Sequence, residues 1–390
     1  MTRRLFAFSV AARLPHGMFS IAVLVHVAHV TGSFAVAGAC AAVLAVSQAV
    51  GGPLAGRLVD RRGQTLVLLT STAGCSLGLF ALASLGEGTP VGWFLCCSAL
   101  IGLCAPPVGA CLRALVPDLV ATAAAQRRVY ALDAAATEIT WVAGPVITFA
   151  IAGWAGTGSA LAGAAVILAS SVAGFSACRA SRRWRPVAVE TAHGGVMGSS
   201  SMRILITVLT GVGVLFGATE VAVTALTESL GASDAAGVLL GLWGLGSLCG
   251  GIVAARSGGG ATTGRGLAVL LALLAAGHAV LAVASAHWVL FGVLIVVAGS
   301  MIAPILATAY GMVDRIVPAA ARTEAFAWLA TATAVGTAIG AALAGALVET
   351  SGPVASFLLA GLAAALAAGL SWRRLRIEES RAAATVSTRQ

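Results

Sequence analysis

Three charged side chains stand well inside otherwise apolar stretches of the sequence. Arg13 lies in the first apolar segment, Glu138 near the middle of the fifth, and Glu220 in the outer half of the seventh. Even lenient insertion scales put the cost of a charged residue at mid-bilayer at about 2.5–3.5 kcal/mol. A buried carboxyl group can carry a proton near neutral pH, whereas an arginine keeps its charge. Glu138 is therefore the first candidate for proton coupling and Glu220 the second.

Each of these residues also has a simpler interpretation. Arg13 needs an acid, a carbonyl or an anionic substrate beside it, so Glu138 is either a proton carrier or a static partner of Arg13. Glu220 has the alternative of reaching water at the outer side of its segment. Three tryptophans lie away from segment ends, where their rings are placed to stack on an aromatic or cationic substrate. They are Trp141, Trp243 and Trp328.

Twelve apolar segments of membrane-spanning length position these residues. The composition is 59% hydrophobic and 9% charged, which is typical of an all-α protein that crosses a membrane many times. Outside the segments, arginines occur only at the N-terminus, in the even-numbered connections and in the C-terminal tail, and lysine is absent. Positive connections stay in the cytoplasm, so both termini are expected inside, in the plasma (inner) membrane. The net charge of +9 is explained by this bias rather than by nucleic-acid binding.

The longest polar stretch divides the segments into two sets of six. We expect an N-terminal half over 1–178, a cytoplasmic linker over 179–203, a C-terminal half over 204–372 and a cytoplasmic tail over 373–390. Gly51-Gly52 recurs as Gly250-Gly251, and Ala105-Pro106 as Ala303-Pro304. Because both recurrences have nearly the same offset, they indicate a parallel repeat with two pseudo-symmetric halves and a substrate between them at mid-membrane.

The connection after the second segment has the pattern of a gating loop. Gly56 permits close helix approach, Gly63 a tight turn, and Asp60 can accept hydrogen bonds from an arginine or a helix N-terminus. With Arg61 the stretch resembles the loop signature of the major facilitator superfamily, although Gln64 and Thr65 depart from it. The resemblance implies twelve helices in two six-helix halves, with a loop that latches them together in one state. The alternative is that these charges only cap and orient the loop.

Prolines mark the expected hinges. Gly144-Pro145 resembles the centre of the fifth-segment signature of drug/proton antiporters in this superfamily, but the flanking glycines are missing and so is the arginine of the fourth segment. Pro106, Pro107 and Pro304 are expected to bend the fourth and tenth segments at equivalent places. Kinks without a role in gating are the alternative.

The function that fits these features is secondary transport. A nucleotide-binding loop of the G-x-x-x-x-G-K-[ST] type needs a lysine, and the sequence has none. The energy is therefore expected to come from a gradient, for which we predict protons. We expect a monomer that exports a small, partly apolar compound by alternating access, with no cofactor and no metal ion. Its partners would be the substrate, protons and the lipid bilayer. Proton-coupled import is the alternative, and a membrane-embedded enzyme a more distant one, because no nucleophile, base or metal-ligand motif occurs.

Overall fold

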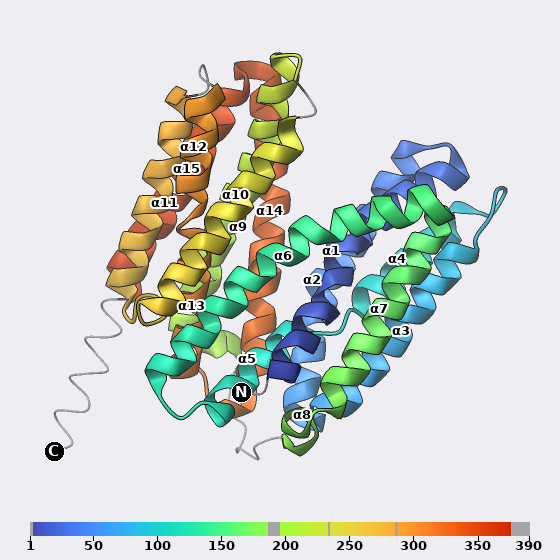
Figure 1. The fold of residues 1–390 in the computed structure, drawn as a ribbon, viewed down its shortest axis with the longest axis horizontal. Coiled ribbons are helices and arrows are strands. Elements are labelled where there is room, and N and C mark those ends of the chain that lie inside the picture. Colours follow the sequence, from blue (N-terminus) through green and yellow to red (C-terminus); the bar gives the residue numbers. More distant parts are fainter. Residues whose placement is uncertain (1–2, 186–195, 233–234, 285–287, 376–390) are drawn as a thin grey trace. The chain divides into compact units, whose positions relative to one another are not determined.

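The computed structural model describes residues 3–185, 196–232, 235–284 and 288–375 (Figure 1). This part of the chain is all-helical, and twelve of its helical stretches are long and apolar enough to cross a membrane. The first six stretches are formed by α1 (Arg3–Thr31), α2 (Phe34–Arg62), α3 (Gln64–Ser84), α4 (Val91–Leu103) with α5 (Val108–Leu119), α6 (Ala123–Ala155) and α7 (Thr157–Ala177).

The last six stretches follow the short helices α8 (Arg179–Arg183) and η1 (Val196–Gly198). They are formed by α9 (Ser200–Ser229), α10 (Ala235–Arg256), α11 (Gly264–Ala284), α12 (Trp288–Gly299) with α13 (Ile302–Ile316), η2 (Ala319–Ala321) with α14 (Arg322–Ser351), and α15 (Pro353–Leu370) with η3 (Ser371–Leu375).

The fourth and tenth spans are each interrupted near their prolines. Pro106 and Pro107 lie in the non-helical break between α4 and α5, and Pro304 lies in the first turn of α13, just after the break that follows α12. Proline has no N–H group for a helical hydrogen bond, which explains why the helices stop here. In contrast, α6 continues through Pro145. The two breaks therefore fall at equivalent places in the two halves of the sequence.

The chain forms two compact units, and each contains the end of a helix from the other half of the sequence. Unit 1 comprises Met1–Val120, Ile139–Glu190 and Ala319–Thr331; unit 2 comprises Ala121–Glu138, Thr191–Pro318 and Ala332–Gln390. The first part of α6 thus packs within unit 2, and the first turns of α14 pack within unit 1. The halves 1–178 and 204–372 stay a prediction about the repeat rather than a description of these units.

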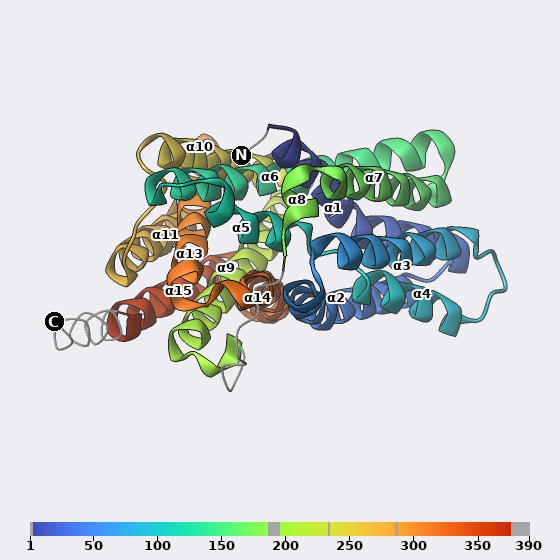
Figure 2. The same cartoon turned by 90° about the horizontal axis from the view of Figure 1, so that it is seen from below.

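Helix packing repeats between the units. In unit 1, α7 packs against α1 and α3, and α2 packs against α4; in unit 2, α15 packs against α9 and α11, and α10 against α12 (Figures 1 and 2). In both units, a glycine allows two of these helices to approach closely. A Cβ atom on Gly51 of α2 would lie 2.5 Å from the Leu103 carbonyl oxygen, and one on Gly250 of α10 would overlap the Ser300 carbonyl. The recurrence seen in the sequence thus corresponds to equivalent helix contacts.

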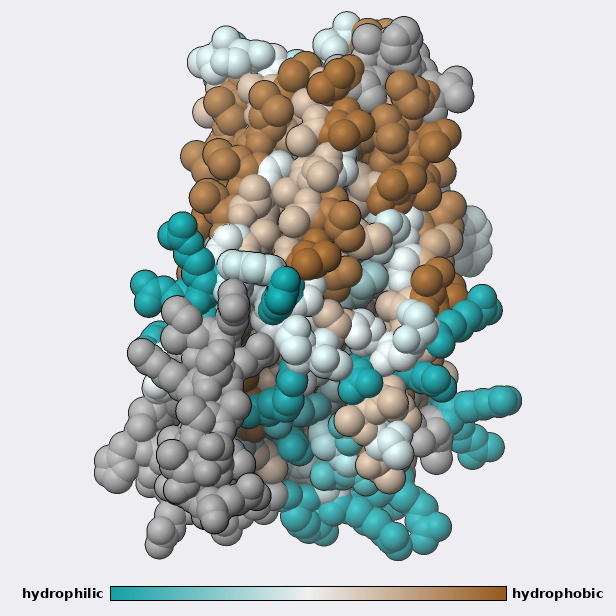
Figure 3. All heavy atoms as spheres, turned by 90° about the vertical axis from the view of Figure 1, so that its left-hand side faces the viewer, coloured by the Kyte–Doolittle hydropathy of each residue, from teal (hydrophilic) through white to brown (hydrophobic). Residues whose placement is uncertain are grey.

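The outward faces of several helices are apolar. On α11, α12 and α15, large hydrophobic side chains are half to two-thirds exposed, among them Leu273, Val293, Leu362 and Leu366. The face drawn in Figure 3 is mainly hydrophobic in its upper half, and its strongly hydrophilic residues gather in the lower half. Surfaces of this kind are stable against hydrocarbon rather than water. The protein is therefore a multi-pass membrane protein.

Candidate functional site

Glu138 is held by a serine of another helix. Its Oε1 atom accepts a hydrogen bond of 2.8 Å from Oγ of Ser247 on α10, and Ser247 is completely buried. Both residues belong to unit 2. The helices approach closely because Gly251 follows one turn further along α10, where a Cβ atom would lie 2.7 Å from that of Ala135 on α6. A hydroxyl group both donates and accepts, so Ser247 can serve the carboxylate and the protonated carboxyl group alike.

An aromatic cluster lies one turn before Ser247 on α10. The Trp243 ring packs edge-on against Phe216 of α9, with ring centres 5.5 Å apart, and against His278 of α11 at 6.0 Å. His278 Nδ1 bonds to the Leu274 carbonyl oxygen at 2.8 Å, so Nδ1 carries the hydrogen and Nε2 is an acceptor. Within the described residues, neither this Nε2 atom nor the Trp243 N–H has a hydrogen-bond partner. The cluster therefore has a buried donor and a buried acceptor near the serine that holds Glu138.

Glu220 lies on α9, four residues after Phe216, and therefore on the same side of that helix. Its side chain is exposed, whereas Thr219 beside it is completely buried. Glu220 is thus accessible, while Glu138 is partly enclosed. Of the two candidate carboxyl groups, Glu138 is the one with a hydrogen bond to the side chain of another helix.

Arg13 is buried in α1, and a second buried arginine lies near it. The side chain of Arg13 donates from Nε to the Ser9 carbonyl oxygen at 3.2 Å. A Cβ atom on Gly109 of α5 would have Arg13 Cδ at 3.5 Å and Arg113 Nη2 at 3.7 Å. The sequence analysis missed the burial of Arg113 because it lies near the end of an apolar segment. Arg13 belongs to unit 1 and Glu138 to unit 2, so their pairing stays a prediction.

The expected gating loop lies against the start of α14, within unit 1. Asp60 is buried, and its two carboxylate oxygens accept hydrogen bonds from the backbone N–H groups of Thr323 at 3.2 Å and Glu324 at 2.8 Å. These N–H groups are free of helical partners at the helix start, and the helix dipole favours a negative charge there. Arg57 adds an ion pair with Glu324 at 4.0 Å. Of the two partners that the sequence allowed, Asp60 thus contacts a helix N-terminus.

Two glycines and an arginine complete this loop. A Cβ atom on Gly56 would lie 2.9 Å from Glu324 Cα, so only glycine permits this approach of α14. Gly63 separates α2 from α3 with a φ of 95°, a conformation that favours glycine. Arg61 is exposed in the last turn of α2. The four motif residues therefore lie around a single contact between α2 and α14.

The corresponding loop of the second half is held by different groups, within unit 2. Arg127 of α6 donates from Nε to the Gly258 carbonyl oxygen at 3.1 Å, and Gly259, with a φ of 90°, has no room for a Cβ atom beside Arg127. Tyr130 of α6 donates to Asp314 of α13 at 2.5 Å. The sequence analysis did not find these contacts, because the loop carries no acid and the partners are a main-chain carbonyl and a distant tyrosine.

The remaining predicted residues are dispersed. Trp141 is exposed on α6, and Trp328 is partly buried on α14 with an indole N–H that has no hydrogen-bond partner within the described residues. Both belong to unit 1, whereas Trp243 belongs to unit 2. Gly144 packs directly on Gly17 of α1, where a Cβ atom would lie 2.5 Å from the Gly17 carbonyl carbon. Among the residues that the structure describes, no group of three metal-ligating side chains is found.

The fold and these contacts define a membrane transporter built from two repeated sets of helices. The family model of the Major Facilitator Superfamily matches residues 5–263 and 221–390. The chain therefore belongs to the major facilitator superfamily, and it is a secondary transporter rather than an enzyme.

Solved structures of three transporters resemble the whole chain. The proton:xylose symporter XylE bound to 6-bromo-6-deoxy-D-glucose has a TM-score of 0.74 at 16% identity, with 95% of each chain covered. The human organic anion transporter MFSD10 (TETRAN) has 0.71 at 17%, covering 95% of this chain and 99% of that one. A bacterial homologue of the iron transporter ferroportin in an outward-facing state has 0.74 at 14%, covering 95% and 98%. At these identities the likeness concerns the fold. Among curated protein sequences, none matches.

Proposed function

We propose that this transporter couples the export of a small, partly apolar compound to proton entry, and that Glu138 carries the proton. The observation that carries this proposal is the bond between Glu138 and Ser247, one turn from the Trp243 cluster. Coupling requires a group that is stable in both protonation states, and a hydroxyl partner meets this need better than a fixed cation does. The same contact argues against a purely static pairing of Glu138 with Arg13.

The aromatic cluster is the proposed start of the substrate site. Trp243 and Phe216 supply apolar surface, while the indole N–H and His278 Nε2 supply a donor and an acceptor with no hydrogen-bond partner among the described residues. A buried polar atom without a partner costs about 1–3 kcal/mol, so a substrate that satisfies these atoms gains from doing so. We keep Trp141 and Trp328 as further proposed substrate contacts, and we assign Glu220 and Arg13 to secondary roles in coupling.

Alternating access needs a contact that forms and breaks. In the proposed cycle, the bonds of Asp60 to the start of α14 hold the arginine-bearing ends of the two halves together, and their release opens the path there. Gly144, Pro145 and the helix breaks at Pro106, Pro107 and Pro304 are the proposed hinges. We place the protein as a monomer in the plasma membrane with both termini in the cytoplasm, because the arginine distribution favours this orientation.

The test measures proton movement in inside-out vesicles from cells that express the protein, against a panel of antibiotics, dyes and sugars. We expect at least one compound to release protons from the acidified lumen, and Glu138→Gln to abolish this release because glutamine cannot carry the proton. Glu87→Gln is the matched control, since Glu87 is exposed in the connection between α3 and α4.

Each result decides between the proposals. A response that survives Glu138→Gln would move the coupling role elsewhere, with Glu220 next in line. If compounds are instead taken up together with protons in right-side-out vesicles, the protein is an importer that works by proton symport, the form of coupling named for XylE. Trp243→Ala should raise the substrate concentration needed for half-maximal response while leaving coupling intact.

A further inference from the structure

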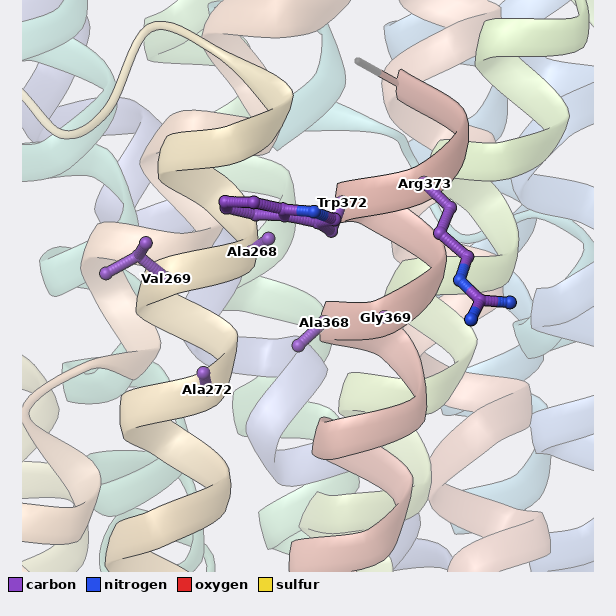
Figure 4. Close-up of a pocket in the computed structure, with 7 residues that line it drawn as sticks. All are labelled: Ala268, Val269, Ala272, Ala368, Gly369, Trp372 and Arg373. Atoms are coloured by element: carbon purple, nitrogen blue, oxygen red, sulfur yellow. The ribbon is translucent and has the colours of Figure 1, made fainter. Parts of the chain in front are cut away.

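A cavity of about 290 Å³ opens between α11 and α15, away from the residues discussed so far (Figure 4). It lies within unit 2. Its walls are made mainly of small side chains. Because alanine and glycine occupy little volume, they leave a space between α11 and α15 that another molecule can enter. The wall residues are Ala268, Val269 and Ala272 of α11 and Ala368 and Gly369 of α15.

One end of this cavity is closed by an aromatic ring with a cation on it. Figure 4 shows Trp372, on the short helix η3 that continues α15, extending toward α11 across the end of the space between Ala268 and Ala368. The Arg265 guanidinium lies over this ring, 4.8 Å from its centre. In the part of the chain that the structure describes, no carboxylate pairs with Arg265. Arg373 and Arg374 follow directly, so this end of the cavity is basic.

The rest of the cavity faces hydrocarbon. Val269 is 50% exposed on α11, and Leu366 and Leu362 are exposed on α15, six and ten residues before Trp372. Tryptophan prefers the membrane–water interface, and arginines close to it attract anionic lipids. An apolar groove that ends in Trp372 and Arg265 thus has the two parts that an amphiphile requires, an apolar wall for a chain and a cation for a charged head.

We propose that this groove binds an anionic phospholipid from the surrounding bilayer. One acyl chain lies along Ala268, Ala272 and Ala368, and the phosphate is held at the Arg265 guanidinium beside Trp372. The proposal does not depend on the direction or the coupling of transport. It commits to a lipid rather than to a free phosphate, because the alanine-lined part of the cavity has no polar group to offer a small ion.

Native mass spectrometry of the purified full-length protein with defined lipids tests this site. Phosphatidylglycerol and phosphatidylcholine with the same acyl chains are added separately, and the first lipid that stays bound is quantified. We expect phosphatidylglycerol to bind about fivefold more tightly, which corresponds to about 1 kcal/mol at 1.4 kcal/mol per factor of ten. Arg265→Gln should reduce its binding to that of phosphatidylcholine, and Ala272→Leu, which fills the groove, should weaken both lipids.

Two control variants carry substitutions of the same types at positions outside the groove. Arg179→Gln removes another exposed arginine, and Ala73→Leu enlarges an exposed alanine on the apolar face of α3; both should bind lipid as the unchanged protein does. Glycerophosphate, which has no acyl chain, should not compete. Four outcomes would each overturn the proposal. They are equal binding of the two lipids, a preference for phosphatidylglycerol that persists in Arg265→Gln, unchanged lipid binding in Ala272→Leu, and competition by glycerophosphate.

Discussion

At the scale of single residues, glycine sets how closely helices cross in this protein. Gly144 was expected to act as a hinge beside Pro145. In the structure it also packs on Gly17, and a Cβ atom on either residue would overlap the backbone of the other helix. The close crossing of α1 and α6 in unit 1 therefore depends on two residues without side chains. The hinge role stays a prediction, but the packing role has a direct consequence for stability.

Gly144→Ala should destabilise the protein, because the new methyl group forces α1 and α6 apart. Overpacking of this kind costs about 1–3 kcal/mol. The matched change is Gly153→Ala in the same helix, where nothing lies within 4 Å of the new Cβ atom. That variant should be neutral or slightly more stable, since alanine favours helices over glycine. Thermal unfolding of both purified variants, followed by tryptophan fluorescence, checks the pair. Equal losses of stability would contradict a crossing contact at Gly144.

The individual site residues differ in how far the sequence alone could identify them. Glu138 could be found because a carboxyl group in an apolar segment is costly and therefore conspicuous. Ser247 and His278 could not, because serine is common in membrane helices and the contacts of both residues depend on helices far apart in the sequence. The sequence pattern thus identified Glu138, whereas Ser247 and His278 could be identified only from the three-dimensional packing.

At the scale of elements, the contact between α2 and α14 is the clearest candidate for a moving part. The sequence predicted the loop motif at Gly56–Gly63 and the kind of partner that Asp60 requires. It could not predict which helix supplies that partner, because the donors are main-chain N–H groups that any helix start provides. The breaks in the fourth and tenth spans, by contrast, follow directly from proline chemistry.

Asp60→Asn should loosen this contact, because asparagine keeps one acceptor oxygen and loses the charge that the start of α14 favours. Loss of a capping group costs about 0.5–2 kcal/mol. Thr323, which is completely buried, is changed to cysteine after the eight native cysteines are replaced by alanine. The rate at which a membrane-permeant thiol reagent labels this cysteine should rise several-fold with Asp60→Asn. Asp118→Asn, which removes an exposed acid at the end of α5, is the control, and an equal rise there would contradict a latch at Asp60.

At the scale of the whole molecule, composition and arginine placement already determined the number of spans. The described part of the chain contains twelve helical stretches long and apolar enough to cross a membrane, as the apolar segments predicted, and the family match confirms the transporter fold. Hydrophobicity alone is enough for this because the hydrocarbon admits only helices with satisfied backbones and apolar surfaces. The way in which each compact unit takes up part of a helix from the other half has no signal in the apolar pattern.

The orientation predicted from arginine placement can be checked with reporter fusions. Green fluorescent protein joined after Arg185, or at the C-terminus, should fluoresce because both sites are expected in the cytoplasm. Alkaline phosphatase inserted between α3 and α4, where no arginine occurs, should be active because that connection is expected outside. A dark fluorescent protein after Arg185 together with an inactive phosphatase between α3 and α4 would reverse the proposed orientation and, with it, the assignment of the Asp60 contact to the cytoplasmic side.

Unit 1 combines segments from both halves of the sequence, and this affects how the protein folds during synthesis. This unit includes Ala319–Thr331, which a ribosome reaches only after most of the 390 residues have been synthesised. Until then, the surface of α2 around Gly56 and Asp60 has no helix to cover it, although α2 itself was inserted early. The nascent protein must therefore carry an unfinished first unit through the synthesis of the eight spans that separate α2 from α14. A chaperone or insertase that shields this surface would act during that interval, and a mutation that slows the emergence of α14 would lengthen it.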